Sequence, residues 1–289
     1  MTTTAQWVEG ARPRTLPAAL SPVLVGTGAA AAADGVRPAR TLLALVVALA
    51  LQIGVNYAND YSDGIRGTDA VRVGPLRLVG SGVARPSAVK AAALTAFAVA
   101  AAAGLVLALL TTLALLAVGA LAILAAWGYT GGANPYGYRG LGEISVFVFF
   151  GLVAVLGTTY VLVEHLTLLA LTGGVASGAL ACAILVANNL RDIPTDRTTG
   201  KKTLAVRLGD PRSRLLYAAL LVTPFVLAVV LTASRPGALL ALAALPLAVG
   251  PLRLVRGGAN GHDLVPVLQQ TGRLQLAYSV LLALGLALL

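Results

Sequence analysis

Two short segments of the chain place aspartate beside asparagine and arginine. The first segment, residues 56–69, contains Asp60, Asp63 and Asp69, and the second, residues 188–197, contains Asp192 and Asp196. Together they hold five of the chain's 11 acidic residues. Carboxylate and amide oxygens are hard ligands that suit Mg²⁺, an ion that also takes phosphate oxygens. The two segments therefore predict a site for divalent cations and phosphate.

The spacing within each segment matches one face of a helix. Asn56, Asp60 and Asp63 are four and three residues apart, and Asn188, Asp192 and Asp196 are four and four apart. Pro194 is expected to disturb the backbone, so that Asp196 projects from the first turn of the following loop. Two opposed clusters can hold two Mg²⁺ ions around one diphosphate and stabilise it as a leaving group. The predicted metal ligands are Asn56, Asp60, Asp63, Asp192 and Asp196, and the four aspartates among them are the predicted catalytic residues.

A simpler interpretation is that these residues cap helices or lie in solvated loops. Two related motifs with five acids argue against it. Amides at membrane depth also argue for function, because polar groups there are costly. We therefore predict substrate contacts from Asn56, Asn59 and Asn188.

Arginine and lysine are the natural partners of a diphosphate. Six candidates lie near the motifs: Arg66, Arg139, Arg191, Arg197, Lys201 and Lys202. Each one could instead contact lipid headgroups. We favour Lys201, just after the second motif, and Arg139, which follows a Gly/Tyr-rich loop, and we include Arg66 among the substrate contacts. Glu143 is interpreted as structural, and His165 as uninvolved.

The composition defines the elements that must position these residues. The chain is 58% hydrophobic and 11% charged, against roughly 25% charged in soluble domains. In lipid only helices and closed barrels satisfy the backbone, and the apolar runs lack strand alternation. The sequence thus predicts an all-α integral membrane protein with one domain over residues 1–289. The single cysteine, Cys182, excludes an intramolecular disulfide.

Nine transmembrane helices are predicted from the apolar runs. Their approximate ranges are 15–33, 40–60, 87–109, 112–130, 142–163, 167–190, 213–233, 236–252 and 268–288. With a cytoplasmic N-terminus, all but three of the 21 basic residues fall on the cytoplasmic side, and the exceptions are Arg37, Arg40 and Arg235. The C-terminus is then outside. The first run also has signal-peptide features, but its removal would expose the rest of the bundle.

The net charge of +10 lies in loops beside the membrane, where it orients the chain and meets anionic lipid. No nucleic-acid partner is expected. Aligning Asp60 with Asp192 also aligns Asn56 with Asn188, and both motifs close an even-numbered predicted span. This indicates a pseudo-repeat about an axis along the membrane normal, with the motifs facing each other across a central cavity.

The two motifs resemble the paired aspartate-rich motifs of the UbiA superfamily of intramembrane prenyltransferases, over nearly the whole chain. Within it, several segments look most like the MenA-type 1,4-dihydroxy-2-naphthoate polyprenyltransferases: 12–17, 67–69 followed by 74–77, 140–151 and 200–209. One departure is that Asp69 follows Asp63 by six residues rather than four, which puts Asp69 in doubt as a ligand.

The resemblance implies a Mg²⁺-dependent reaction in the plasma membrane of a bacterium. A polyprenyl diphosphate ionises, the ring of 1,4-dihydroxy-2-naphthoate attacks the allylic cation, and CO₂ is lost to give demethylmenaquinone. Arg12 or Arg14 is expected to pair with the naphthoate carboxylate; orientation in the membrane would also explain both. Three alternatives stay open: another branch of the superfamily, such as a 4-hydroxybenzoate, chlorophyllide or phosphoribose prenyltransferase, a membrane phosphoglycosyl transferase, or a transporter.

Overall fold

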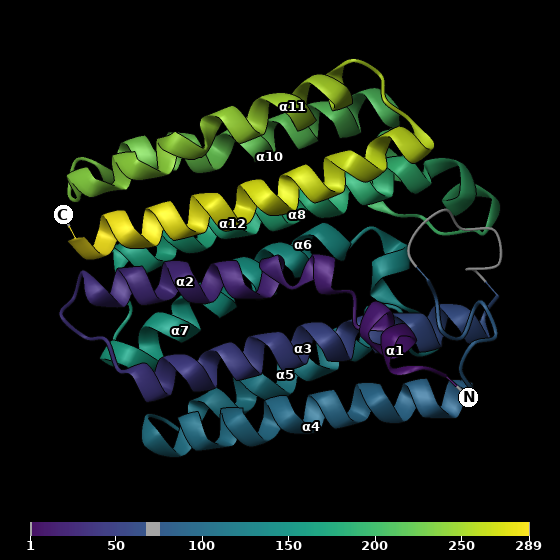
Figure 1. The fold of residues 1–289 in the computed structure, drawn as a ribbon, viewed down its shortest axis with the longest axis horizontal. Helices are drawn as coiled ribbons and strands as arrows, with labels where there is room; N and C mark the ends of the chain where they lie inside the picture. The colour runs from purple at the N-terminus through teal and green to yellow at the C-terminus, as the bar shows by residue number, and fades with distance from the viewer. Residues whose placement is uncertain (1, 68–75, 289) are drawn as a thin grey trace.

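The computed structural model describes residues 2–67 and 76–288. Long helices run roughly side by side in a bundle, and the two chain ends lie at opposite ends of it (Figure 1). α10 and α11 lie along one side of the bundle, and α4 and α5 lie along the other. The elements form in the order α1 (Thr4–Gly10), η1 (Pro13–Thr15), α2 (Pro17–Ala31), α3 (Pro38–Ile65), α4 (Pro86–Leu110), α5 (Ala114–Gly128), η2 (Tyr136–Arg139), α6 (Gly142–Val146), η3 (Phe147–Val153), α7 (Ala154–Val163), α8 (Leu168–Thr198), α9 (Leu204–Leu208), α10 (Asp210–Leu231), η4 (Pro236–Ala244), α11 (Leu245–Arg256), η5 (Gly261–Leu264) and α12 (Val265–Leu288).

Seven helices in the described part are long and apolar enough to cross a membrane. They are Pro38–Ile65, Pro86–Leu110, Gly142–Val163, Leu168–Thr198, Asp210–Leu231, Pro236–Arg256 and Gly261–Leu288. α2 and α5 are apolar but shorter, with 15 residues each. The predicted all-helical class is confirmed.

Four of the motif aspartates, Asp60, Asp63, Asp192 and Asp196, lie inside helices rather than after them. α3 continues to Ile65 and α8 to Thr198, several residues beyond the ends expected from the apolar runs. The expected break at Pro194 is wrong, because α8 passes through this residue and Asp196 remains helical. A proline removes one backbone hydrogen bond, and neighbouring helices can compensate for the loss. These four aspartates are therefore held by helical backbone.

α2 packs in the middle of the bundle against α12, α7 and α8. Its glycines allow this close approach: a Cβ on Gly28 would lie 2.5 Å from the Cα of Ala283, and a Cβ on Gly26 would lie 2.7 Å from the Cβ of Thr158. Small residues let helix backbones approach closely where lipid offers no hydrophobic driving force. These two glycines are explained by packing.

Arg40 ties three helices together at the end of the bundle opposite the motifs. Its Nη1 donates to the carbonyl of Val161 at 3.0 Å, and its Nη2 donates to that of Leu110 at 2.8 Å. Arg40 and Arg37 also pair with Glu164, at 2.9 and 2.6 Å. Because one guanidinium reaches both carbonyls, the ends of α4 and α7 lie at the same level.

Candidate active site

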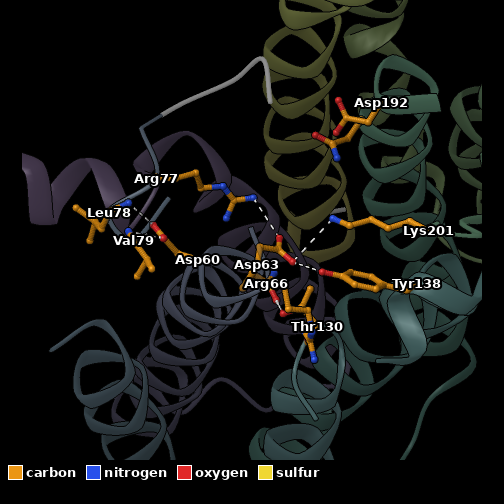
Figure 2. A network of polar contacts seen from close by, with 12 residues as sticks. Asp60, Asp63, Arg66, Arg77, Leu78, Val79, Thr130, Tyr138, Asp192 and Lys201 are labelled. Carbon is orange, nitrogen blue, oxygen red and sulfur yellow. Dashed lines mark hydrogen bonds and ion pairs between the residues drawn. The ribbon is translucent and has the colours of Figure 1, made fainter. Parts of the chain in front are cut away.

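Asp60 is fully buried near the end of α3 and holds a neighbouring segment of chain. Its Oδ2 accepts a hydrogen bond from the amide of Leu78 at 2.7 Å, and its Oδ1 accepts one from the amide of Val79 at 3.0 Å. Figure 2 shows Asp60 pointing to this segment while Asp63 points the other way. Both Asp60 oxygens are thus engaged by backbone.

Asp63 is the point where three other segments meet α3. The phenol of Tyr138 in η2 donates a hydrogen bond to Oδ1 of Asp63. Nη2 of Arg77 lies 3.7 Å from Oδ2, and Nζ of Lys201 lies 3.9 Å from Oδ1 (Figure 2). Nζ of Lys201 also lies 4.5 Å from the centre of the Tyr138 ring. Asp63 therefore links the first motif to the loop that follows the second.

The amides of the first motif hold other parts of the chain. Nδ2 of Asn56 donates to the carbonyl of Ala11 at 2.8 Å and to Oγ1 of Thr15 at 2.9 Å. Oδ1 of Asn59 accepts from Oγ1 of Thr130 at 2.7 Å. These contacts fold the N-terminal segment and the loop after α5 onto α3.

Arg66 also binds the loop after α5. Its guanidinium donates to the carbonyls of Thr130 and Gly132, and lies 5.7 Å from the centre of the Tyr138 ring. In this structure Arg66 fixes the loop, and its predicted contact with substrate stays a prediction.

The second motif is organised around Arg191. Its Nε and Nη2 donate to the two carboxylate oxygens of Asp192 at 2.7 and 2.8 Å, and Nη2 also donates to Oδ1 of Asn188 at 2.9 Å. Asp196 is buried and accepts from Oγ1 of Thr203 at 3.4 Å. Its backbone carbonyl accepts from the amide of Lys201 at 2.9 Å. The turn after α8 is thereby closed.

Asn189 and Glu143 form a buried pair beside the second motif. Nδ2 of Asn189 donates to Oε1 of Glu143 at 2.9 Å, and the thiol of Cys182 donates to the backbone carbonyl of Glu143 at 3.1 Å. The pair joins α6 to α8. This contact agrees with the structural role expected for Glu143.

The remaining predicted cations lie at the surface of the same end of the bundle. The side chains of Arg14 and Arg139 are exposed, and neither forms a hydrogen bond or ion pair within the described chain. Lys202 is exposed, and its amide donates to the carbonyl of Tyr138 at 2.8 Å. Asp69 lies outside the described residues.

The donors fit Mg²⁺ by their chemistry. They are oxygen atoms of buried carboxylates, with histidine and cysteine ligands absent from the described parts of both motifs. No three His, Cys, Asp or Glu residues within 2–67 and 76–288 gather around one point. In the described structure, protein donors contact the carboxylates of Asp60, Asp63, Asp192 and Asp196. The structure brings Asp63 close to Lys201 without gathering the four aspartates.

An apolar cavity of about 350 Å³ lies between α2, α3, α4, α5, η3 and α7. Gln52, Asn56, Asn59, Tyr129 and Tyr136 line it, and apolar side chains and glycines form most of the rest. Tyr136 donates to the carbonyl of Ala125 at 2.7 Å, and burial raises the pKa of its phenol. The π-helix η3 contributes further lining residues, and such π segments are frequent at functional sites.

Tyr138 and Arg77 are two site residues that the motifs did not single out. Both belong to segments that loops bring to Asp63. The signals present in the sequence were the Gly/Tyr-rich loop before Arg139 and Arg77 at the end of residues 74–77. Neither signal specifies which side chain meets the aspartates.

The fold and site define a class of protein: a multi-pass helical membrane protein whose acidic and basic side chains gather at one end, beside an apolar cavity. The chain belongs to the UbiA prenyltransferase family, whose profile matches residues 19–263. It is 56% identical over 287 residues to the 1,4-dihydroxy-2-naphthoate octaprenyltransferase of Mycobacterium tuberculosis, covering 99% of this chain and 98% of that protein.

Two solved structures share the fold at low sequence identity. The apo structure of a UbiA homologue from Aeropyrum pernix K1 gives a TM-score of 0.70 at 17% identity, covering 93% of this chain and 96% of that one. A UbiA homologue from Archaeoglobus fulgidus bound to GPP and Mg²⁺ gives 0.68 at 15% identity, covering 96% and 99%. These likenesses support the overall helical arrangement.

Proposed function

We propose that this chain transfers a polyprenyl group from polyprenyl diphosphate to 1,4-dihydroxy-2-naphthoate, giving the quinol form of demethylmenaquinone, CO₂ and diphosphate. The observation that carries the proposal is the 56% identity to a 1,4-dihydroxy-2-naphthoate octaprenyltransferase over nearly all of both chains. Family membership, the buried aspartates and the apolar cavity agree with a prenyl transfer.

Arg77 and Lys201 are the cations best placed to receive the diphosphate. Both approach Asp63 at the distances of loose ion pairs rather than tight hydrogen bonds. A diphosphate offers more negative charge than one carboxylate, so these side chains can turn to it with small movements. Arg191 already donates hydrogen bonds to both carboxylate oxygens of Asp192, and we assign it the role of positioning the second motif.

The residues that would hold Mg²⁺ are Asp63, Asp192 and Asp196. Asp60 contributes by fixing residues 78 and 79, beside Arg77. When bound, Mg²⁺ would supply Lewis-acid stabilisation of the charge that develops on the departing diphosphate. The homologue bound to GPP and Mg²⁺ supports this choice of ion.

The cavity suits the hydrocarbon chain and the reactive carbon. Its mostly apolar wall excludes water, which would otherwise capture an allylic cation. The carbon–oxygen bond to diphosphate breaks, and the ring carbon that carries the carboxylate forms the new carbon–carbon bond. The carboxylate then leaves as CO₂, and its bonding electrons restore the aromatic ring.

We infer that all nine apolar helical segments cross the membrane, including α2 and α5. A 15-residue helix spans about 22 Å, shorter than a hydrocarbon core of roughly 30 Å. Both helices nevertheless pack alongside the longer helices of the bundle, α2 against α12 and α5 against α4. We further infer one domain with a pseudo-repeat about a central cavity. The N-terminus and the site would then lie in the cytoplasm and the C-terminus outside, in a bacterial plasma membrane.

The experiment is a prenyl transfer assay with purified protein, Mg²⁺, octaprenyl diphosphate and a panel of aromatic acids, with products identified by mass. We expect prenylated naphthoquinol and one CO₂ per transfer. Chelation should abolish turnover, and added Mg²⁺ should restore it. Prenylation of 4-hydroxybenzoate with the carboxylate retained would contradict the proposal that the naphthoate is the acceptor. Turnover after exhaustive chelation would contradict the proposal that the reaction needs Mg²⁺.

A further inference from the structure

Three glycines line the apolar cavity without any packing reason for being glycine. They are Gly104 in α4, Gly119 in α5 and Gly157 in α7. A Cβ placed on any of the three would meet nothing within 4 Å. By contrast, a Cβ on Gly26 or Gly28 would collide with a neighbouring helix. The three cavity glycines therefore leave open space rather than permit close helix contact.

These glycines carry a cost that packing does not offset. Glycine in a helix interior is less favourable than alanine by roughly 1 kcal/mol, because it loses more backbone freedom on folding. Three such positions on three helices border the same cavity. A ligand that occupies the space beside them accounts for the small residues.

The three glycines lie at a similar distance from the end of the bundle that holds Arg40, which is the end opposite the aspartates. Gly104 precedes Leu110 by six residues and Gly157 precedes Val161 by four, or about 9 and 6 Å of helix. The carbonyls of Leu110 and Val161 bind the same guanidinium, that of Arg40. Gly119 lies five residues into α5, about 8 Å from its start.

The end of the cavity beside the aspartates lies much further from Arg40 than the three glycines do. Asn59 lies 19 residues after Arg40 on α3, which is about 28 Å of helix. A donor with its diphosphate beside Asp63 reaches the level of the three glycines only with a long prenyl chain. Short donors end before it.

We propose that Gly104, Gly119 and Gly157 are specificity-determining residues that admit the distal part of a long prenyl chain. The inference rests on the proposed prenyl transfer and extends it to chain length. Larger side chains at these positions fill the space and restrict the enzyme to shorter donors, while the site at the aspartates stays intact.

The test compares kcat/KM for geranyl, geranylgeranyl and octaprenyl diphosphate in Gly104→Leu, Gly119→Leu and Gly157→Leu. We expect the octaprenyl-to-geranyl ratio of kcat/KM to fall at least roughly tenfold, within the discrimination that a hydrophobic pocket provides. The corresponding alanine variants should give smaller falls. Ala120→Leu is the matched control, since Ala120 is an exposed neighbour of Gly119 that does not line the cavity.

A ratio unchanged in all three leucine variants, with wild-type turnover of geranyl diphosphate, overturns the inference. Equal losses with every donor also overturn it if thermal unfolding shows intact protein. Thermal stabilisation by geranyl and by octaprenyl diphosphate gives a second readout that needs no turnover. If the wild type transfers no prenyl group, the proposed function fails, and this binding difference still decides the chain-length inference.

Discussion

Nζ of Lys201, five residues after the last aspartate of the second motif, lies 3.9 Å from Oδ1 of Asp63 in the first. The two residues are far apart in the chain and come from different parts of the bundle. Their contact brings the loop after α8 to the end of α3 (Figure 2). Through this contact the regions of the two motifs meet at Asp63. Asp60 differs from Asp63, because the carboxylate of Asp60 accepts hydrogen bonds from backbone amides.

Because Asp60 and Asp63 have different partners, their substitution by asparagine should have different effects on activity and on thermal unfolding. Asp63→Asn should lower kcat by roughly 10²–10³-fold, the scale for removing a group that stabilises developing charge. Its midpoint of thermal unfolding should fall less than that of Asp60→Asn, because the amide oxygen of asparagine can still accept a hydrogen bond from Tyr138. Asp60→Asn should lower the midpoint of thermal unfolding, because an amide cannot accept from two backbone N–H groups as a carboxylate does; the cost is about 1–3 kcal/mol.

The measurement is kcat together with thermal unfolding in the same detergent, with Asp34→Asn, remote from the motifs, as the control. If Asp60→Asn keeps its unfolding midpoint and loses all activity, Asp60 acts as a ligand of the reaction centre, as the helical spacing predicted. The separation of roles drawn from the hydrogen bonds would then be wrong.

Tyr138→Phe removes one hydrogen bond to Asp63 and keeps the ring that packs against Lys201. A hydrogen bond to a charged group contributes about 1.5–3 kcal/mol. We expect kcat/KM for the prenyl diphosphate to fall by roughly ten- to a hundredfold, with KM for the acid unchanged. Tyr160→Phe, near the opposite end of the bundle, serves as the control. An unaltered kcat/KM would mean that the phenol contact is incidental.

The sequence alone was sufficient for the helical class and for the placement of both motifs at one end of the bundle. Apolar runs specify membrane helices because lipid leaves the backbone few choices. Lys201 was predicted as a contact of the diphosphate, and this stays a prediction; the structure places its Nζ 3.9 Å from Oδ1 of Asp63.

The partners of the individual side chains could not be predicted. Asn56 shares a helix face with Asp60 by spacing, yet its amide binds Ala11 and Thr15, because the N-terminal segment folds back onto α3. Leu78 and Val79 reach Asp60 through a loop that has no periodic pattern. Helical spacing predicts which side chains share a face of one helix, whereas these contacts depend on how loops fold onto that helix.

Arg14 is expected to recognise the carboxylate of the aromatic acid. It is exposed beside the start of α2 and makes no hydrogen bond or ion pair within the described chain, so it is available to a ligand. A carboxylate entering an apolar site needs a cation. Arg14→Gln should raise the KM for the naphthoate about tenfold and leave that for the prenyl diphosphate unchanged.

Arg139→Gln is the comparison, since Arg139 is also exposed and unpaired within the described residues. It should affect the diphosphate rather than the acid. Kinetics in which Arg14→Gln and Arg12→Gln both leave the naphthoate KM unaltered would place the carboxylate elsewhere.

At the opposite end of the bundle, Glu164 should make stability depend on acid pH. Hydrogen bonds from Arg40 and then Arg37 lower its pKa in the folded protein. A lowered pKa means that the folded state favours the ionised carboxylate, so the contribution is present above the unfolded pKa, about 4.3. It is lost as the pH falls through the lower, folded pKa.

Glu164→Gln should therefore unfold at a lower temperature than the wild type at pH 7, and the difference should shrink in acid. The effect is small, because the carboxylate is exposed and screened by solvent. Glu9→Gln is the control, since Glu9 is an exposed glutamate at the motif end without a side-chain partner in the described chain. Thermal unfolding from about pH 2.5 to pH 8 measures both variants across this range. A Glu164→Gln difference that persists unchanged at the acid end would show that the ion pairs do not stabilise the fold.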